Sequence, residues 1–202
     1  MEDRTSVHHT PVDGRRRRRE LGRLAVVDAV IDLILDGGGP PTAEQIAERA
    51  EVSVASVFRY FTSLDELRQV GVQRYFERID HLLGIDDVAE GPLPRRIDRF
   101  VSARLEFYRV TEPMARLARH QAYDVDQMRT SLRRIRATLA DQVAQHFAPE
   151  LDGLRPATRA DRVAVIAALT SFEAWDLMRE QGLDRAAIRR AWRHHLAVIL
   201  TA

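Results

Sequence analysis

Hydrophobic residues recur at steps of three and four along most of the chain, the spacing that gathers them on one face of an α-helix. Met128, Leu132, Ile135, Leu139 and Val143 follow it clearly in one segment. No stretch predicts a strand with comparable clarity. The pattern predicts an all-α fold of nine helices, over residues 24–35, 42–50, 54–60, 63–83, 95–110, 114–123, 126–147, 157–181 and 184–200.

Three of these helix starts fall close together, between residues 42 and 67. Thr42 with Gln45, and Ser63 with Glu66, have the spacing of a capping box, in which side chains satisfy the free backbone N–H groups of a first helical turn. Ser53 can cap the short helix between them. Two short helices separated by a tight turn and followed by a third helix predict a helix-turn-helix.

A helix-turn-helix places its second helix in the major groove of DNA. The predicted second helix presents Val54, Ala55, Ser56 and Arg59 on its exposed face, with Tyr60 near its end. Arg59 is the candidate for direct base readout, because a guanidinium can donate two hydrogen bonds to guanine. The alternative is a helical hairpin that packs only within its own domain.

These residues resemble the DNA-binding domain of the TetR family of transcriptional repressors. The resemblance rests on Ile46-Ala47 with Ala50, on Val52-Ser53, on the run 58–61 and on residues 63–67. It implies that the DNA-binding residues are Thr42, Ser53, Val54, Ala55, Ser56, Phe58, Arg59 and Tyr60. Relatives commonly have glycine, lysine and tyrosine where this chain has Glu51, Leu64 and Phe58. Those departures favour an alternative, a helical ligand-binding protein of the same ancestry without specific DNA binding.

Loops and charge runs predict three parts of the chain. Residues 1–20 are expected to form a flexible arginine-rich arm, residues 21–66 the helix-turn-helix domain, and residues 67–202 a helical domain for effector binding and dimerisation. The helix over 63–83 should join the two domains as a lever. The arm ends near five consecutive arginines: Arg15, Arg16, Arg17, Arg18 and Arg19. These side chains either contact DNA phosphates and the minor groove or are simply solvated.

Composition narrows the classes of function. The 202 residues are 45% hydrophobic and 30% charged, with a formal net charge of +1, which is typical of a globular protein. The absence of cysteine excludes disulfides and thiolate sites and is compatible with a reducing cytoplasm. We expect a cytoplasmic protein, because no apolar run approaches the length of a membrane span and the N-terminus lacks a signal-peptide pattern.

The C-terminal part is rich in aromatic residues and methionines, which suit a pocket for an apolar small molecule. The alternative is that these side chains only fill a core. Three polar residues stand out in this mostly apolar part, because each needs a partner: Arg104, His120 and Glu173. The candidate ligand pocket consists of Phe100, Arg104, Phe107, Tyr108, Met114, His120, Tyr123, Met128, Phe172, Trp175 and Met178.

Other chemistry is not predicted. The histidines lack the helical spacing of a metal site, and no catalytic or dinucleotide motif is present, so we expect neither a metal, a cofactor nor an enzyme; a small helical enzyme is the remaining alternative. Residues 163–169 are apolar all round with small neighbours, which predicts cover by a second copy of the chain. The resemblance implies a homodimeric repressor that a small apolar effector releases from a palindromic double-stranded DNA operator.

Overall fold

The computed structural model describes residues 11–37 and 40–201, without the side chains of Pro11, Val12, Asp13, Arg15 and Leu64. All regular structure in these ranges is helical, which confirms the all-α prediction. The chain divides into two compact units, Met1–Glu77 and Arg78–Ala202. None of the described helices is long and apolar enough to cross a membrane.

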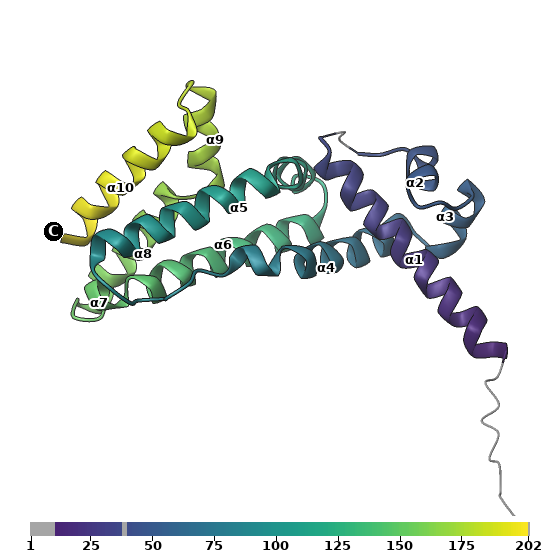
Figure 1. Cartoon of the computed structure of the whole chain (residues 1–202), viewed down its shortest axis with the longest axis horizontal. Helices are drawn as coiled ribbons and strands as arrows, with labels where there is room; N and C mark the ends of the chain where they lie inside the picture. Colours follow the sequence, from purple (N-terminus) through teal and green to yellow (C-terminus); the bar gives the residue numbers. More distant parts are fainter. Residues whose placement is uncertain (1–10, 38–39, 202) are drawn as a thin grey trace, which may run out of the picture. The chain divides into compact units, whose positions relative to one another are not determined.

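The first unit packs two short helices against a long one. It contains α1 (Pro11–Leu35), α2 (Ala43–Arg49), α3 (Val54–Tyr60) and the start of α4 (Leu64–Leu83) (Figure 1). Helix α1 contacts both α2 and α3. Val26 and Val27 of α1 are fully buried, and Ile46 of α2 and Val57 of α3 are nearly so, which places the apolar stripes of the three helices in one core.

The second unit is built around α5. It contains the end of α4, then α5 (Leu93–Gln121), α6 (Asp126–His146), α7 (Ala148–Leu151), α8 (Pro156–Leu169), α9 (Phe172–Glu180) and α10 (Arg185–Thr201). Helix α5 contacts both α6 and α10, and α8 contacts the same two helices (Figure 1). Their shared core includes the fully buried Phe100, Tyr108, Phe147 and Trp192.

The helices of the structure differ from the predicted ones at four places. Helix α1 begins at Pro11, so the arginine run lies in a helix rather than in the predicted flexible arm. Residues 1–10 of that predicted arm lie outside the described ranges. Helix α5 continues through Pro113, where a break was expected. A short helix, α7, lies where only a break was expected, and the helix predicted over 157–181 is divided after Leu169.

The predicted caps are present at several helix ends. Thr42 and Gln45 form a reciprocal capping box, and Asp184 accepts a hydrogen bond from the Ala187 N–H at 2.7 Å. Gly182, with φ of +86°, ends α9 as predicted. The Ser63 hydroxyl caps the Glu66 N–H at 3.1 Å, but the Glu66 carboxylate accepts from the Thr62 N–H instead of completing the box.

Candidate nucleic-acid interface

The turn between α2 and α3 is a Schellman motif, a helix end closed by two backbone hydrogen bonds. The Val52 N–H donates to the Ala47 carbonyl at 3.0 Å, and the Glu51 N–H donates to the Glu48 carbonyl at 3.2 Å. Glu51 has φ of +54°, the left-handed conformation that usually requires glycine. The chain therefore closes this turn with a strained glutamate, at a position where the family that the sequence resembles commonly has glycine.

Ser53 starts the recognition-helix candidate, α3. Its side chain accepts a hydrogen bond from the Ser56 N–H at 3.2 Å, and the two hydroxyls lie 2.9 Å apart. Ser56 is buried, so its expected place on the exposed face was wrong. The reason is that Ser56 and Val57 share the inward side of a helix of only two turns, with Phe61 buried just beyond its end.

The outward side of α3 presents an aromatic ring and a guanidinium. Phe58 keeps 70% of its surface exposed, and Ala55 and Arg59 are exposed as well, while Val54 is half-buried. The Arg59 Nη2 donates to the Ser56 hydroxyl at 2.9 Å. This hydrogen bond restrains the guanidinium and leaves its other N–H groups free to donate. Because α3 contains no acidic residue, this face is positive and partly apolar.

Tyr60 is turned toward α1. A Cβ added to Gly22 would lie 2.4 Å from the Tyr60 hydroxyl oxygen, so only glycine permits this approach. Tyr60 is accordingly half-buried against the helix, while Thr42 is exposed and uses its hydroxyl to cap α2. Because the predicted helix begins only at residue 24, the sequence pattern did not reveal the Gly22 contact.

An ion pair that the sequence pattern did not reveal fixes α4 to α1. The Arg23 Nη2 donates to Glu66 at 2.7 Å, and the Arg23 guanidinium lies 5.2 Å from the centre of the Phe61 ring. Hydrogen bonds from the Thr62 backbone and hydroxyl, followed by the Arg23 charge, lower the pKa of Glu66. No sequence rule pairs residues 43 positions apart, so this ion pair could not be predicted.

The basic run lies in the first part of α1. Arg16, Arg17, Arg18 and Arg19 are exposed, while the side chain of Arg15 lies outside the described ones. Consecutive helical residues point about 100° apart, so the run surrounds the first turns of α1 with positive charge. The side chain of Leu64, at a position where the family that the sequence resembles commonly has lysine, also lies outside the described ones.

The residues of the predicted ligand pocket are only partly brought together. Seven of them are buried in the second unit: Phe100, Arg104, Phe107, Tyr108, Met128, Phe172 and Trp175. Met114 and Met178 are half-buried, but His120 is exposed and Tyr123 is 85% exposed, so these last two do not belong to the buried group. Both lie near the C-terminal end of α5, beyond the residues that face the core.

Two buried polar side chains of this group, and Glu173 beside Phe172, have defined partners. The Tyr108 hydroxyl donates to the Thr170 carbonyl at 2.8 Å, and Arg104 donates to the Leu139 carbonyl at 3.1 Å. Glu173 is bound by Arg119 and Arg136 at the surface. Across the described residues, histidine, aspartate and glutamate side chains form no group of three suited to a metal ion.

No protein-family model matches the chain, and no curated protein matches it by sequence. Among solved structures, the chain is similar to a transcriptional regulator from Rhodococcus sp. Rha1, with a TM-score of 0.56 and 19% sequence identity. The similarity covers 91% of this chain and 96% of that chain. At this identity it shows that the two proteins share an all-helical fold over nearly their whole length.

Proposed function

We propose that this chain is a DNA-binding transcriptional regulator whose recognition helix is α3. The observation that carries the proposal is the orientation of α3, which buries Ser56 and Val57 and leaves Phe58 and Arg59 exposed. An aromatic ring can pack on thymine methyl groups, and a guanidinium can read guanine, so this face suits the major groove. The name of the structural neighbour, a transcriptional regulator, agrees with the proposal.

We further propose that the regulator is a homodimer. Helix α8 leaves Val165 53% exposed beside the exposed Ala164 and Ala168, and Val198 of α10 is 53% exposed. Small and branched apolar residues on two neighbouring helices suit packing against the same helices of a second copy. Recognition helices in such a dimer would lie about 34 Å apart and read the halves of a near-palindromic operator.

The resemblance to TetR repressors supports a role for a small apolar effector. Helix α4 begins in the first unit and ends in the second, so a change in the second unit could be transmitted along one continuous helix. An effector bound among the aromatic residues of the second unit would favour a conformation that the operator does not fit. Repression would then end when the effector binds.

Fluorescence anisotropy with labelled DNA from the chain's own upstream region tests the DNA-binding proposal. Binding should weaken steeply as salt rises, because phosphate contacts release counterions. Arg59→Ala should cost about 1–3 kcal/mol of binding free energy, with the loss concentrated at one operator position. Arg133→Ala, which removes an exposed arginine from α6, is the matched control and should bind as the parent does.

A second candidate remains, a ligand-binding protein without specific DNA recognition. It is favoured by the strained turn at Glu51 and by Phe58, which lacks the hydroxyl that relatives use. Salt-insensitive or absent DNA binding, unchanged by Arg59→Ala, would support this candidate against the regulator. The DNA test therefore separates the two.

Sedimentation velocity tests the dimer separately. Val165→Glu should shift the chain toward monomer, because it places a charge in the proposed apolar interface. Val88→Glu changes a similarly exposed valine in the loop between α4 and α5 and serves as the control. A dimer equally resistant to both substitutions would contradict the proposed α8 interface.

A further inference from the structure

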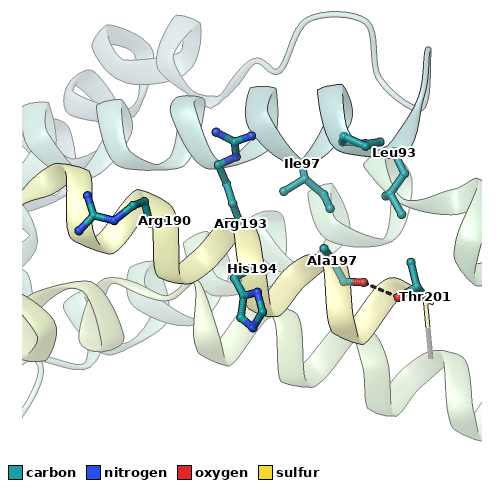
Figure 2. A pocket seen from close by; sticks show the side chains of 8 residues that line it. Leu93, Ile97, Arg190, Arg193, His194, Ala197 and Thr201 are labelled. Atoms are coloured by element: carbon teal, nitrogen blue, oxygen red, sulfur yellow. Dashed lines mark hydrogen bonds between the residues drawn. The ribbon is translucent and has the colours of Figure 1, made fainter.

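A groove lies in the second unit, between the start of α5 and the outer side of α10 (Figure 2). Its volume is about 420 Å³, within the usual range for sites that bind small molecules. Leu93 and Ile97 of α5 and Ala197 of α10 give it an apolar lining. It does not include any of the buried residues expected to form the effector pocket.

The ionisable side chains that line the groove are all basic, and the hydroxyl of Thr201, which also lines it, donates to the Ala197 carbonyl at 2.8 Å. Arg190, Arg193 and His194 contribute to its lining from α10, and no aspartate or glutamate does (Figure 2). An apolar lining beside two guanidinium groups is poorly matched to a cation, which the arginines would repel. A neutral apolar molecule could use the lining but would gain nothing from the charges.

The two arginines differ in how far their charge is already compensated. Arg190 has neither an ion pair nor a hydrogen bond with any described residue, and it is exposed. Arg193 lies 3.4 Å from Asp98, whose two carboxylate oxygens already accept hydrogen bonds from Arg189 at 2.9 and 3.0 Å. One carboxylate thus serves two arginines, and the groove retains an uncompensated positive charge.

We propose that this groove binds an amphipathic anion, a carboxylate carried on an unbranched acyl chain. The carboxylate would be held by Arg190 and Arg193, whose planar guanidinium groups match its geometry. The acyl chain would lie along Ala197 toward Ile97 and Leu93. The proposal goes beyond the regulator function, since it assigns a second ligand site outside the buried core.

Isothermal titration calorimetry with the full chain tests the proposal, using decanoate below its micelle concentration as the probe. Decanol and decyltrimethylammonium carry the same chain with no charge and with positive charge. Decanoate should bind about tenfold or more tightly than either, which is the ratio expected for a charge-assisted hydrogen bond. Octanoate should bind about tenfold more weakly than decanoate, because it buries two fewer methylene groups.

Substitutions locate the binding. Arg190→Ala should weaken decanoate about tenfold and leave decanol unchanged, whereas Arg133→Ala should change neither. Ala197→Phe should abolish decanoate binding by filling the groove, with circular dichroism to confirm that the helices remain. If Ala197→Phe does not fold, Arg193→Ala replaces it and should weaken decanoate as Arg190→Ala does.

Three results would overturn the proposal. Equal affinity for decanoate and decanol would show that the arginines take no part. Decanoate binding that survives both Arg190→Ala and Ala197→Phe would place the ligand elsewhere, such as in the buried core. Absence of binding, together with a dimer that dissociates on Arg190→Ala, would show that the groove is an interface between copies. None of these results would affect the DNA-binding test of Arg59.

Discussion

Arg96 and Arg104 of α5 are equally buried, each 3% exposed, but their charges have different surroundings. Arg96 pairs with Glu150 and donates to the carbonyls of Gly91 and His146. Arg104 donates to the Leu139 carbonyl, lies 4.8 Å from the centre of the Phe100 ring, and pairs with no carboxylate among the described residues. Burial lowers the pKa of Arg104, which marks the cost of keeping this charge in the core.

Methionine substitutions should therefore have opposite effects at the two sites. Arg104→Met is expected to raise the free energy of unfolding by about 1 kcal/mol or more, because it removes a buried charge that no carboxylate compensates. Arg96→Met should lower it by about 3–5 kcal/mol, because Glu150 would lose its partner. Urea denaturation followed by tryptophan fluorescence reports on this unit, which contains both tryptophans. Destabilisation by Arg104→Met would show that its π contact and hydrogen bonds outweigh desolvation.

Glu51 and Gly182 occupy the same position of two Schellman motifs, at the ends of α2 and α9. Glu51→Gly should raise the free energy of unfolding by up to about 1 kcal/mol, since glycine adopts positive φ without strain, although its freedom in the unfolded chain offsets part of the gain. Gly182→Ala is the reverse change and should cost about 1 kcal/mol, because its Cβ would meet no atom within 4 Å and only the conformation is strained. Chemical denaturation followed by circular dichroism measures both. Equal signs for the two changes would contradict this explanation.

At the scale of elements, a side chain of α5 holds the break between α8 and α9. Thr170 is buried, and its carbonyl accepts the Tyr108 hydroxyl at 2.8 Å, while its own hydroxyl donates to the Ile166 carbonyl at 2.7 Å. Ser171 then caps α9 by accepting from the Ala174 N–H at 3.1 Å. The chain can leave the helix here because its backbone carbonyl has another donor.

Tyr108→Phe should lower the free energy of unfolding by about 1–3 kcal/mol, because it leaves the Thr170 carbonyl buried without that donor. Hydrogen exchange should accelerate at residues 170–175, where the cap and the break are located. Tyr123→Phe removes a hydroxyl from a tyrosine that is 85% exposed and should leave stability unchanged. Equal effects of the two substitutions would show that the break between α8 and α9 does not depend on the Tyr108 hydrogen bond.

The predictability of each element depended on where its stabilising partner lies in the sequence. Thr42, Ser53 and Asp184 cap their helices through neighbours three residues away, so spacing alone located those starts. The break at Thr170 depends on a residue 62 positions earlier, and no local pattern records it.

Pro113 shows the limit of a local rule in the other direction. Proline removes the donor for the Arg109 carbonyl, which predicts a break, but Arg109 is exposed and water can satisfy that carbonyl. Helix α5 therefore continues. At the DNA-binding candidate, the cap of α3 was predictable, whereas the burial of Ser56 and the Tyr60 contact with α1 required the packed unit.

At the scale of the whole molecule, 31 arginines are nearly balanced by 30 acidic residues, so the pH dependence of stability should come from particular groups with shifted pKa values rather than from net charge. His146 is fully buried, and its Nε2 donates to the Arg96 carbonyl at 2.9 Å. Its Nδ1 has no partner among the described residues. Burial lowers the pKa of His146, and the charges of Arg99 and Arg96 lower it further.

Acid should therefore destabilise the second unit in two separate ranges of pH. Below about 6.5, the unfolded chain binds the His146 proton more tightly than the folded chain, so the free energy of unfolding should fall by up to about 1.4 kcal/mol per pH unit until the folded pKa is passed. Glu173 responds at lower pH. Burial alone would raise its pKa, but hydrogen bonds from Arg136 and Arg119 lower it to about 2, so its contribution to stability is lost only as pH falls below 4.5.

Urea denaturation between pH 7 and 5 consequently isolates the effect of His146. His146→Gln, which can retain the donor to Arg96, should flatten this dependence, whereas His120→Gln changes an exposed histidine and should preserve it. If the slope persists in His146→Gln, another group must bind the proton on unfolding.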